Sequence, residues 1–178
     1  MSQPLQDEGY VINLYDLGDS SLITHVFLKG NGVVKLVAKG AKSPKSPFSG
    51  CLELFNKVEV SYQQARGTSD LHTTREISVI TQSEGIRNSY PRLLTASYFC
   101  ALVDYWVTLE SGDLYDLFSR ALEYVNDNEL KWRGVTYFEE ELSRLLGYSK
   151  RSEEVTKIYR ANQRIEKLRK EVERTLET

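Results

Sequence analysis

The chain has 178 residues, of which 40% are hydrophobic and 27% are charged, and its formal net charge is −2. This length fits one large domain or two small ones, and the composition is that of an ordinary globular protein with a packed core. The nearly balanced charge excludes a uniformly basic or acidic chain, so a charged partner would have to be recognised by a local cluster.

No part of the sequence has the features of a membrane span or a secretion signal. No apolar run approaches the length that crosses a bilayer, and the N-terminal MSQPLQDEGY lacks a basic and an apolar region. Cys51 and Cys100 lie far apart, without a Cys-x-x-Cys motif, which argues against a disulfide framework and a zinc site. We therefore expect a protein of the reducing cytoplasm with no membrane contact, no metal and no cofactor.

Five runs rich in Val, Ile, Leu, Thr, Tyr and Phe predict strands in the first eighty residues. They cover residues 10–15, 21–28, 32–38, 52–62 and 71–80. The Gly-Asn-Gly sequence at 30–32 suits a tight hairpin, and a long Ser/Pro connection at 40–50 separates the third run from the fourth. Five short strands with one long connection indicate a Greek-key barrel of the OB type, and an SH3-like barrel remains the alternative.

After Ser83, apolar residues recur at intervals of three and four, which predicts helices. The first begins near Pro91 and a second is capped by Asp113, while a third covers 135–146 and a final long helix covers 152–176. An all-β half followed by an all-α half excludes an alternating α/β fold. We predict an α+β protein with an OB-fold domain at residues 1–82 and an all-α helical domain at residues 83–178.

Five lysines and no Asp or Glu lie between residues 20 and 52, although the whole chain is slightly acidic. Strand alternation places Lys35 and Lys39 together on the outer face of the barrel, and Lys42 and Lys45 follow in a Gly/Ser loop whose backbone can approach a phosphate. The outer face of an OB barrel is a usual seat of single-strand binding, where outward aromatic rings stack on bases. The nucleic-acid-binding candidates are Lys29, Lys35, Lys39, Lys42, Lys45 and Arg66, and the aromatic candidates are Tyr10, Tyr15, Phe27, Phe48, Phe55 and Tyr62.

The alternative interpretation is that these lysines only solvate an exposed strand and loop. We favour an anionic partner because no acidic residue interrupts the run. On this hypothesis the amines form one continuous cationic surface on the outside of the first domain.

No catalytic constellation is apparent in the sequence. His25 and His72 share no cysteine or carboxylate pattern, and we interpret both as structural or surface residues. The Gly-Ala-Lys-Ser sequence at 40–43 is not a P-loop, because that motif needs a glycine immediately before the lysine. We therefore expect that the protein is not an enzyme.

Two segments of the sequence carry motifs that are typical of one protein family. The most specific is the Val-Ala-Lys-Gly-Ala-Lys core at 37–42, which follows a Gly-Asp-Ser-Ser turn at 18–21. The second, from Phe138-Glu139 to Leu145-Leu146-Gly147-Tyr148, resembles the Phe-Glu…Leu-Gly-Tyr helix of the family's helical domain. With these motifs the sequence resembles RecO, the bacterial recombination mediator, and the resemblance covers roughly residues 8–148. Some members hold zinc with four cysteines beyond this point, where this sequence has no cysteine.

The resemblance implies an OB-fold domain followed by a helical domain, with no catalytic centre, in a cytoplasmic, nucleoid-associated protein of DNA repair and recombination. Such proteins bind single- and double-stranded DNA and anneal complementary strands. They engage the C-terminal tail of single-stranded DNA-binding protein and work with RecR to help load the recombinase. Carried over to this sequence, the DNA contacts are Lys35, Lys39, Lys42 and Lys45.

A candidate site for the partner's tail precedes the helix that resembles the family's. Lys131 and Arg133 flank Trp132, and two cations around an aromatic ring would suit a peptide that ends in Phe and a carboxylate. The alternative function is a protein-interaction adaptor, in which both domains dock partners and nucleic-acid contact is incidental.

Overall fold

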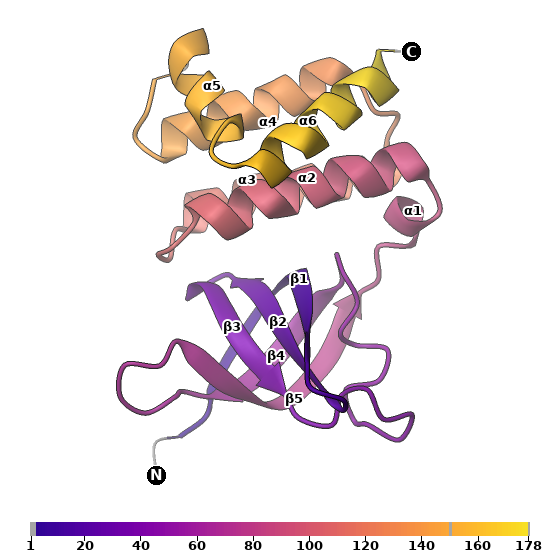
Figure 1. Ribbon diagram of the computed structural model, residues 1–178, viewed down its shortest axis with the longest axis vertical. Coiled ribbons are helices and arrows are strands. Elements are labelled where there is room, and N and C mark those ends of the chain that lie inside the picture. The colour runs from indigo at the N-terminus through magenta and orange to yellow at the C-terminus, as the bar shows by residue number, and fades with distance from the viewer. Residues whose placement is uncertain (1–2, 150, 178) are drawn as a thin grey trace. The chain divides into compact units, whose positions relative to one another are not determined.

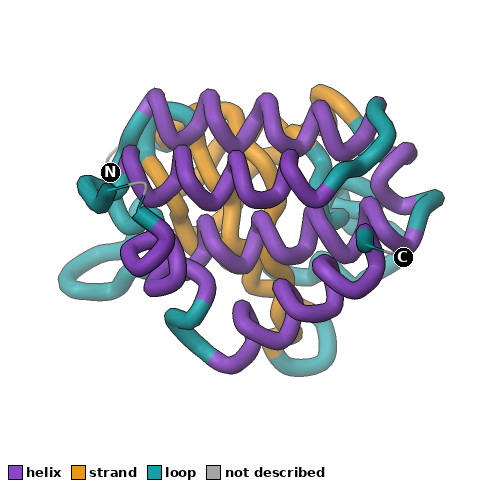
Figure 2. Tube along the Cα trace, turned by 90° about the horizontal axis from the view of Figure 1, so that it is seen from above, coloured by secondary structure: helices purple, strands orange, loops and turns teal. Residues whose placement is uncertain are grey.

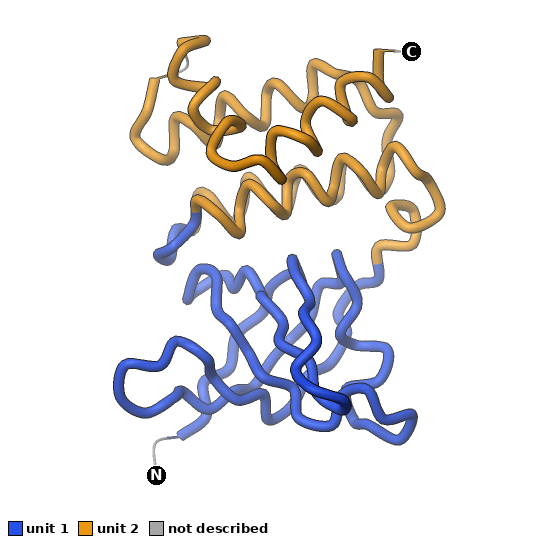
Figure 3. The backbone as a smooth tube through the Cα atoms, in the orientation of Figure 1, with its two compact units in different colours: residues 1–82, 107–111 blue, residues 83–106, 112–178 orange. Residues whose placement is uncertain are grey.

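The computed structural model describes residues 3–149 and 151–177, which form five strands followed by six helices. The chain forms two compact units, residues 1–82 with 107–111 and residues 83–106 with 112–178 (Figure 3). The short segment 107–111 groups with the first unit, which a single boundary at residue 82 does not capture.

The five strands close into a barrel in the order β1-β2-β3-β5-β4, with β4 also hydrogen-bonded to β1 (Figure 1). Only β3 and β5 run parallel, over a short stretch, and the other pairs are antiparallel. This connectivity is that of an OB fold, so the predicted fold class is confirmed. The strands are β1 (Leu5–Leu17), β2 (Ser21–Leu28), β3 (Gly32–Ala38), β4 (Lys57–Gln63) and β5 (Leu71–Thr81).

The hairpin between β2 and β3 is fixed by a carboxylate from β1. Asp7 Oδ2 accepts hydrogen bonds from the backbone N–H of Gly30, at 3.0 Å, and from the side-chain amide of Asn31, at 2.6 Å. Gly32 has a φ of 68°, a conformation that glycine adopts without the strain of a side chain. The Gly-Asn-Gly sequence therefore forms the tight turn that its composition predicts.

Side chains of β3 alternate between the barrel interior and its outside, as predicted. Val34 and Leu36 are buried in the interior cluster, and Lys35 between them is exposed. The long connection after β3 turns back to close one end of the barrel, because its Phe48 packs with Ala38. The main interior cluster consists of Val11, Val26, Leu28, Val34, Leu36, Val58, Val60 and Tyr62.

A β-bulge in β1 changes which side chains of that strand face outward. The pairing of β1 with β2 shifts between Val11 and Asn13, so that one extra residue is accommodated there. Val11 and Leu14 both pack in the interior, and Tyr15 is 44% exposed. Strict alternation from Val11 would have placed Tyr15 inside, so the bulge is the reason that this ring lies on the outer surface.

The helical unit has long helices that lie side by side, with α2 next to both α3 and α6 (Figure 2). Buried apolar residues from each long helix form its core, among them Leu102, Phe118 and Phe138. None of the helices in the described part of the chain is apolar over a length that would cross a bilayer. The helices are α1 (Glu84–Arg87), α2 (Tyr90–Trp106), α3 (Gly112–Asp127), α4 (Trp132–Leu145), α5 (Ser152–Tyr159) and α6 (Gln163–Leu176).

The prediction of one long helix at 152–176 is wrong, because the segment contains the two helices α5 and α6. Asn162 has an extended backbone, with a φ of −154°, and its side chain accepts a hydrogen bond from the N–H of Ile165. This is the geometry of an N-cap, which starts a new helix. The apolar periodicity continues across the break and therefore did not reveal it.

Helix α6 is held in the helical unit by a buried ion pair. Arg169 donates from Nε to Glu139 Oε1 at 2.7 Å and from its second terminal nitrogen to Oε2 at 3.1 Å, and Glu139 is only 1% exposed. The hydroxyl of Tyr98 donates to the same carboxylate at 2.6 Å. The Arg169 guanidinium also lies 3.7 Å from the ring centroid of Tyr159 and 4.9 Å from that of Trp132. Residues of α2, α4, α5 and α6 thus meet in one cluster.

Candidate nucleic-acid interface

The outer surface of β2 and β3 lies between two loops of the barrel. These are the β1–β2 loop, residues 18–20, and the β4–β5 loop, residues 64–70. In OB folds the equivalent strands and loops contact oligonucleotides. We call this surface the β2–β3 face and define it by Tyr15, Ile23, His25 and Lys35, together with Lys39, Lys42 and Lys45 of the segment that follows β3.

Cross-strand pairing brings an aromatic pair next to an amine on the β2–β3 face. His25 is paired with Asn13 on one side and with Lys35 on the other. The rings of Tyr15 and His25 have centroids 5.1 Å apart, and the Asn13 side-chain amide donates to the Tyr15 hydroxyl at 2.6 Å. An exposed ring that is held in this way offers a surface on which a base can stack.

Of the six aromatic residues considered from the sequence, Tyr15 is the one that the structure leaves exposed. The other five, Tyr10, Phe27, Phe48, Phe55 and Tyr62, are buried. His25 was interpreted as a structural or surface residue, and its place beside Tyr15 becomes visible only through the strand register. His72, in contrast, accepts a hydrogen bond from the backbone N–H of Ala65 and stacks against Tyr62, which accounts for it structurally.

Two of the candidate lysines are paired with carboxylates that lie outside the acid-free interval of residues 20–52. Lys35 Nζ lies 2.6 Å from Asp70 Oδ2, and the hydrogen bond and charge of Lys35 lower the pKa of Asp70. Lys42 Nζ lies 2.8 Å from Asp16 Oδ1 and donates to the carbonyl of Gly18 at 3.2 Å. Both acids lie outside residues 20–52, so the one-sided charge of that segment is balanced in space.

The other cations are exposed, but they do not all belong to one surface. Within residues 3–149 and 151–177, Lys39 and Lys45 have no carboxylate partner, and they follow the end of β3 that lies beside the β1–β2 loop. Lys29 follows β2 at the other end of the hairpin, roughly 20 Å along the strands from Lys39. Arg66 is exposed in the β4–β5 loop, four residues before Asp70.

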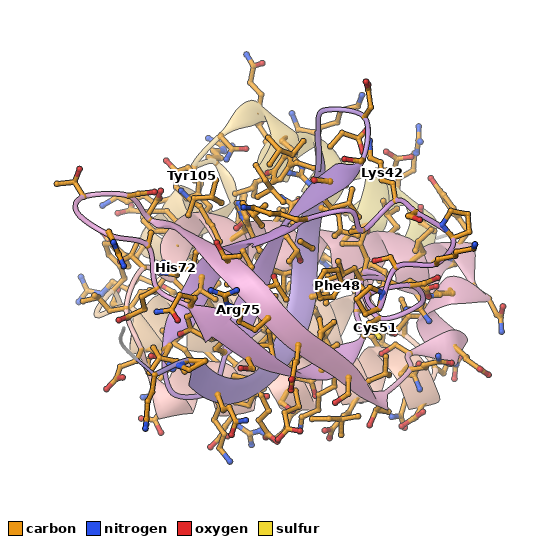
Figure 4. The ribbon with its side chains drawn as sticks, turned by 90° about the horizontal axis from the view of Figure 1, so that it is seen from below. Lys42, Phe48, Cys51, His72, Arg75 and Tyr105 are labelled. Carbon is orange, nitrogen blue, oxygen red and sulfur yellow. The ribbon has the colours of Figure 1, made fainter. Side chains whose placement is uncertain are left out.

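The expected continuous ridge is therefore interrupted. The basic part of the β2–β3 face is concentrated at Lys35, Lys39 and Lys42, with Lys45 further along the loop. Seen from below in Figure 4, Lys42 lies apart from His72 and Arg75 of β5.

A separate apolar cavity of about 470 Å³ lies in the helical unit, between α3 and α4. We call it the α3–α4 pocket. Arg120, Lys131 and Arg133 are its charged lining residues, and no acidic side chain lines it. Its other lining residues are Thr95, Phe99, Leu117, Ala121, Tyr124, Val125, Leu130, Gly134, Val135, Tyr137 and Phe138.

The structure divides the three residues proposed for tail binding. Lys131 and Arg133 line the α3–α4 pocket, whereas Trp132 is absent from its lining and lies over the guanidinium of Arg169. The sequence prediction missed Arg120 and Tyr124, which reach the pocket from the neighbouring helix. Their apolar neighbours on α3 follow the ordinary helical period and gave no signal of a cavity.

The described residues contain no group of three or more His, Cys, Asp or Glu side chains that could hold a metal ion. Burial raises the pKa of the Cys100 thiol strongly, which keeps it protonated and unreactive at neutral pH. The chemistry that the geometry offers is stacking and phosphate contact on the barrel, and docking of an apolar, anionic group in the helical unit.

Comparisons with known proteins connect this geometry to one family. Residues 1–83 match the sequence profile described as "Recombination protein O N terminal". The chain is 30% identical over 148 residues to the DNA repair protein RecO of Pelobacter propionicus, an alignment that covers 82% of this chain and 59% of the relative. It is 29% identical over 139 residues to that of Idiomarina loihiensis, covering 77% and 58%, and 29% identical over 121 residues to that of Syntrophotalea carbinolica, covering 67% and 46%.

The chain spans about half the length of these curated relatives. The matches include the strands that carry the β2–β3 face and, in the longer alignments, extend over most of the chain. The chain belongs to the RecO family.

Proposed function

We propose that this chain is a non-catalytic DNA repair and recombination protein whose barrel binds single-stranded DNA on the β2–β3 face. The observation that carries the proposal is the exposed Tyr15 ring, packed against the half-buried His25 ring beside Lys35, on the outer face of an OB barrel, with Lys39 directly after β3. The relatives bear the name DNA repair protein RecO, which supports a role at DNA.

The face offers both contacts that single strands require. The ring of Tyr15 stacks on an unpaired base, and the amines of Lys39 and Lys45 neutralise phosphates. Bases in a duplex are already stacked on each other, so double-stranded DNA meets only the amines and binds more weakly. A role at DNA also places the protein in the cytoplasm, at the nucleoid.

We further propose that the bound strand is presented for annealing. Stacking and phosphate contacts engage the faces of bases and the backbone, so the base edges stay open for pairing with a complementary strand. With RecR as a partner, the same bound state would serve in loading the recombinase. The likeness to RecO supports both steps.

The α3–α4 pocket is our proposed site for the C-terminal tail of single-stranded DNA-binding protein. Its apolar walls suit an aromatic side chain, and Arg120, Lys131 and Arg133 suit carboxylates. The tail contacts are thus Lys131 and Arg133 without Trp132. This pocket is also the observation that favours the second candidate function, a protein-interaction adaptor with incidental nucleic-acid contact.

A titration of fluorescent oligo(dT) at several salt concentrations tests the DNA-binding proposal. Two available lysines, Lys39 and Lys45, predict that affinity falls by about seven-fold between 50 and 200 mM salt, and four phosphate contacts predict about fifty-fold. An adaptor would show no such response, and affinity that is independent of salt would refute the phosphate-contact mechanism.

Substitutions within the barrel identify the binding surface. Lys39→Glu and Tyr15→Ala should each weaken binding, the second by roughly 5- to 160-fold if one base stacks there. Lys29→Glu is the matched control, because it makes the same charge change at the opposite end of the hairpin. Equal losses for Lys39→Glu and Lys29→Glu would show that binding is not localised on the β2–β3 face.

A further inference from the structure

Both loops that border the β2–β3 face are tied to it by an ion pair. Asp16 is the penultimate residue of β1, before the β1–β2 loop, and binds Lys42, which also donates to the carbonyl of Gly18 within that loop. Asp70 is the last residue of the β4–β5 loop and binds Lys35. Each pair thus holds one amine of the basic region through a carboxylate at a flanking loop.

The two pairs are exposed and can exchange partners. The carboxylate side chains of Asp70 and Asp16 are 73% and 77% exposed, and the side chains of Lys35 and Lys42 are 45% and 30% exposed. A pair in such a position is held weakly by comparison with a buried one. A phosphate can therefore replace either carboxylate, but the displaced acid then remains next to a polyanion.

We infer that Asp16 and Asp70 compete with DNA phosphates for Lys42 and Lys35, and so limit the affinity of the β2–β3 face for single strands. This inference rests on the proposed function of the face. Lys39 and Lys45 have no such competitor among the described residues and are available from the first encounter. The face thus has two permanent cations and two that are withheld until a carboxylate is displaced.

The arrangement favours rapid dissociation of a bound DNA strand over tight binding. Withholding two phosphate contacts lowers affinity, and differences in affinity within one interface are expressed mainly in the dissociation rate. The same exchange would break one ion pair at each flanking loop, Asp16–Lys42 and Asp70–Lys35. A strand bound in this way dissociates readily enough to be passed to a complementary strand.

Neutral substitutions of the two acids test the inference. Asp16→Asn and Asp70→Asn keep the side-chain shape and should each tighten oligo(dT) binding at 50 mM salt by about 1.4- to 5-fold, the range that exposed ion pairs span. The double variant should approach the fifty-fold salt response of four contacts, against about seven-fold for the unsubstituted chain. Asp19→Asn is the matched control, because it removes the same charge three residues after Asp16, within the β1–β2 loop, without freeing a lysine.

A coupling measurement separates competition from a general loss of negative charge. Lys35→Gln should weaken binding more in the Asp70→Asn background than in the unsubstituted chain, because only there is the amine fully available. The inference is overturned if Lys35→Gln has equal effects in both backgrounds, or if Asp19→Asn tightens binding as much as Asp16→Asn and Asp70→Asn do. In either case Lys39→Glu would still weaken binding, as the proposed function requires. If the unsubstituted chain does not bind oligo(dT) at all, the proposed function fails first, and this inference falls with it.

Discussion

Replacement of Arg169 by Met should destabilise the helical unit far more than loss of an ordinary surface ion pair. The substitution leaves the Glu139 carboxylate, which is 1% exposed, with the Tyr98 hydroxyl as its remaining donor in this cluster. Removal of one partner of a buried pair costs about 3–5 kcal/mol, because an uncompensated charge stays in the interior. Loss of the guanidinium from the rings of Tyr159 and Trp132 adds about 0.5–2 kcal/mol for each contact.

The measurement is urea unfolding followed by circular dichroism at the helical band, because all six helices belong to the second unit. Arg144→Met is the matched control. Its partner Glu141 lies 3.0 Å away at i−3, but the arginine side chain is 52% exposed, so the expected loss is below about 1 kcal/mol.

A second variant distinguishes buried charge from lost packing. Glu139→Gln combined with Arg169→Met removes both charges, so the double variant should be more stable than Arg169→Met alone. If Arg169→Met costs no more than Arg144→Met, or if the added Glu139→Gln brings no recovery, the cluster is not held together by the ion pair.

Three further outcomes follow from the same structure. Burial, with the Glu139 carboxylate, raises the pKa of the Tyr98 hydroxyl, so the contribution of Tyr98 to the unfolding free energy should be constant up to about pH 10 and fall above it, because the tyrosine ionises first in the unfolded chain. In a urea series, Tyr98→Phe should reduce that fall. Lys131→Glu with Arg133→Glu should weaken binding of an acidic peptide that ends in Phe by roughly ten-fold or more in fluorescence anisotropy, whereas oligo(dT) binding should not change; equal loss of both would refute separate sites. Cys51 should react with a thiol reagent in the folded protein, whereas Cys100 should react only after unfolding. The absorbance of the thiolate that the reagent releases measures both reactions.

Much of the barrel could be predicted because its strands bury one face. In β3 the alternation of Val34, Lys35 and Leu36 is enough to assign interior and exterior, and the Gly-Asn-Gly turn fixes the hairpin. The order of the strands could be inferred only from their number and the one long connection. The alternation and the turn depend only on residues that are close together in the chain, so a single sequence is enough to recognise them.

The composition of the site depends on features that local patterns do not contain. The bulge after Val11 reverses the side on which Tyr15 emerges, and no residue type marks it unambiguously. Asp16 reaches Lys42 from β1 and Asp70 reaches Lys35 from the β4–β5 loop, so counting charges within one segment could not find them. The break at Asn162 was hidden in a similar way, since Asn also occurs within helices and only its hydrogen bond identifies the cap.

Closure of the barrel also constrains how any macromolecule can engage it. Each of the five strands already has a hydrogen-bonded neighbour on either side, so no strand offers a visiting polypeptide an edge that is unpaired along its whole length. Recognition on this unit therefore falls chiefly to side chains and loops. Binding preferences can then diverge through single surface replacements while the scaffold is left unchanged.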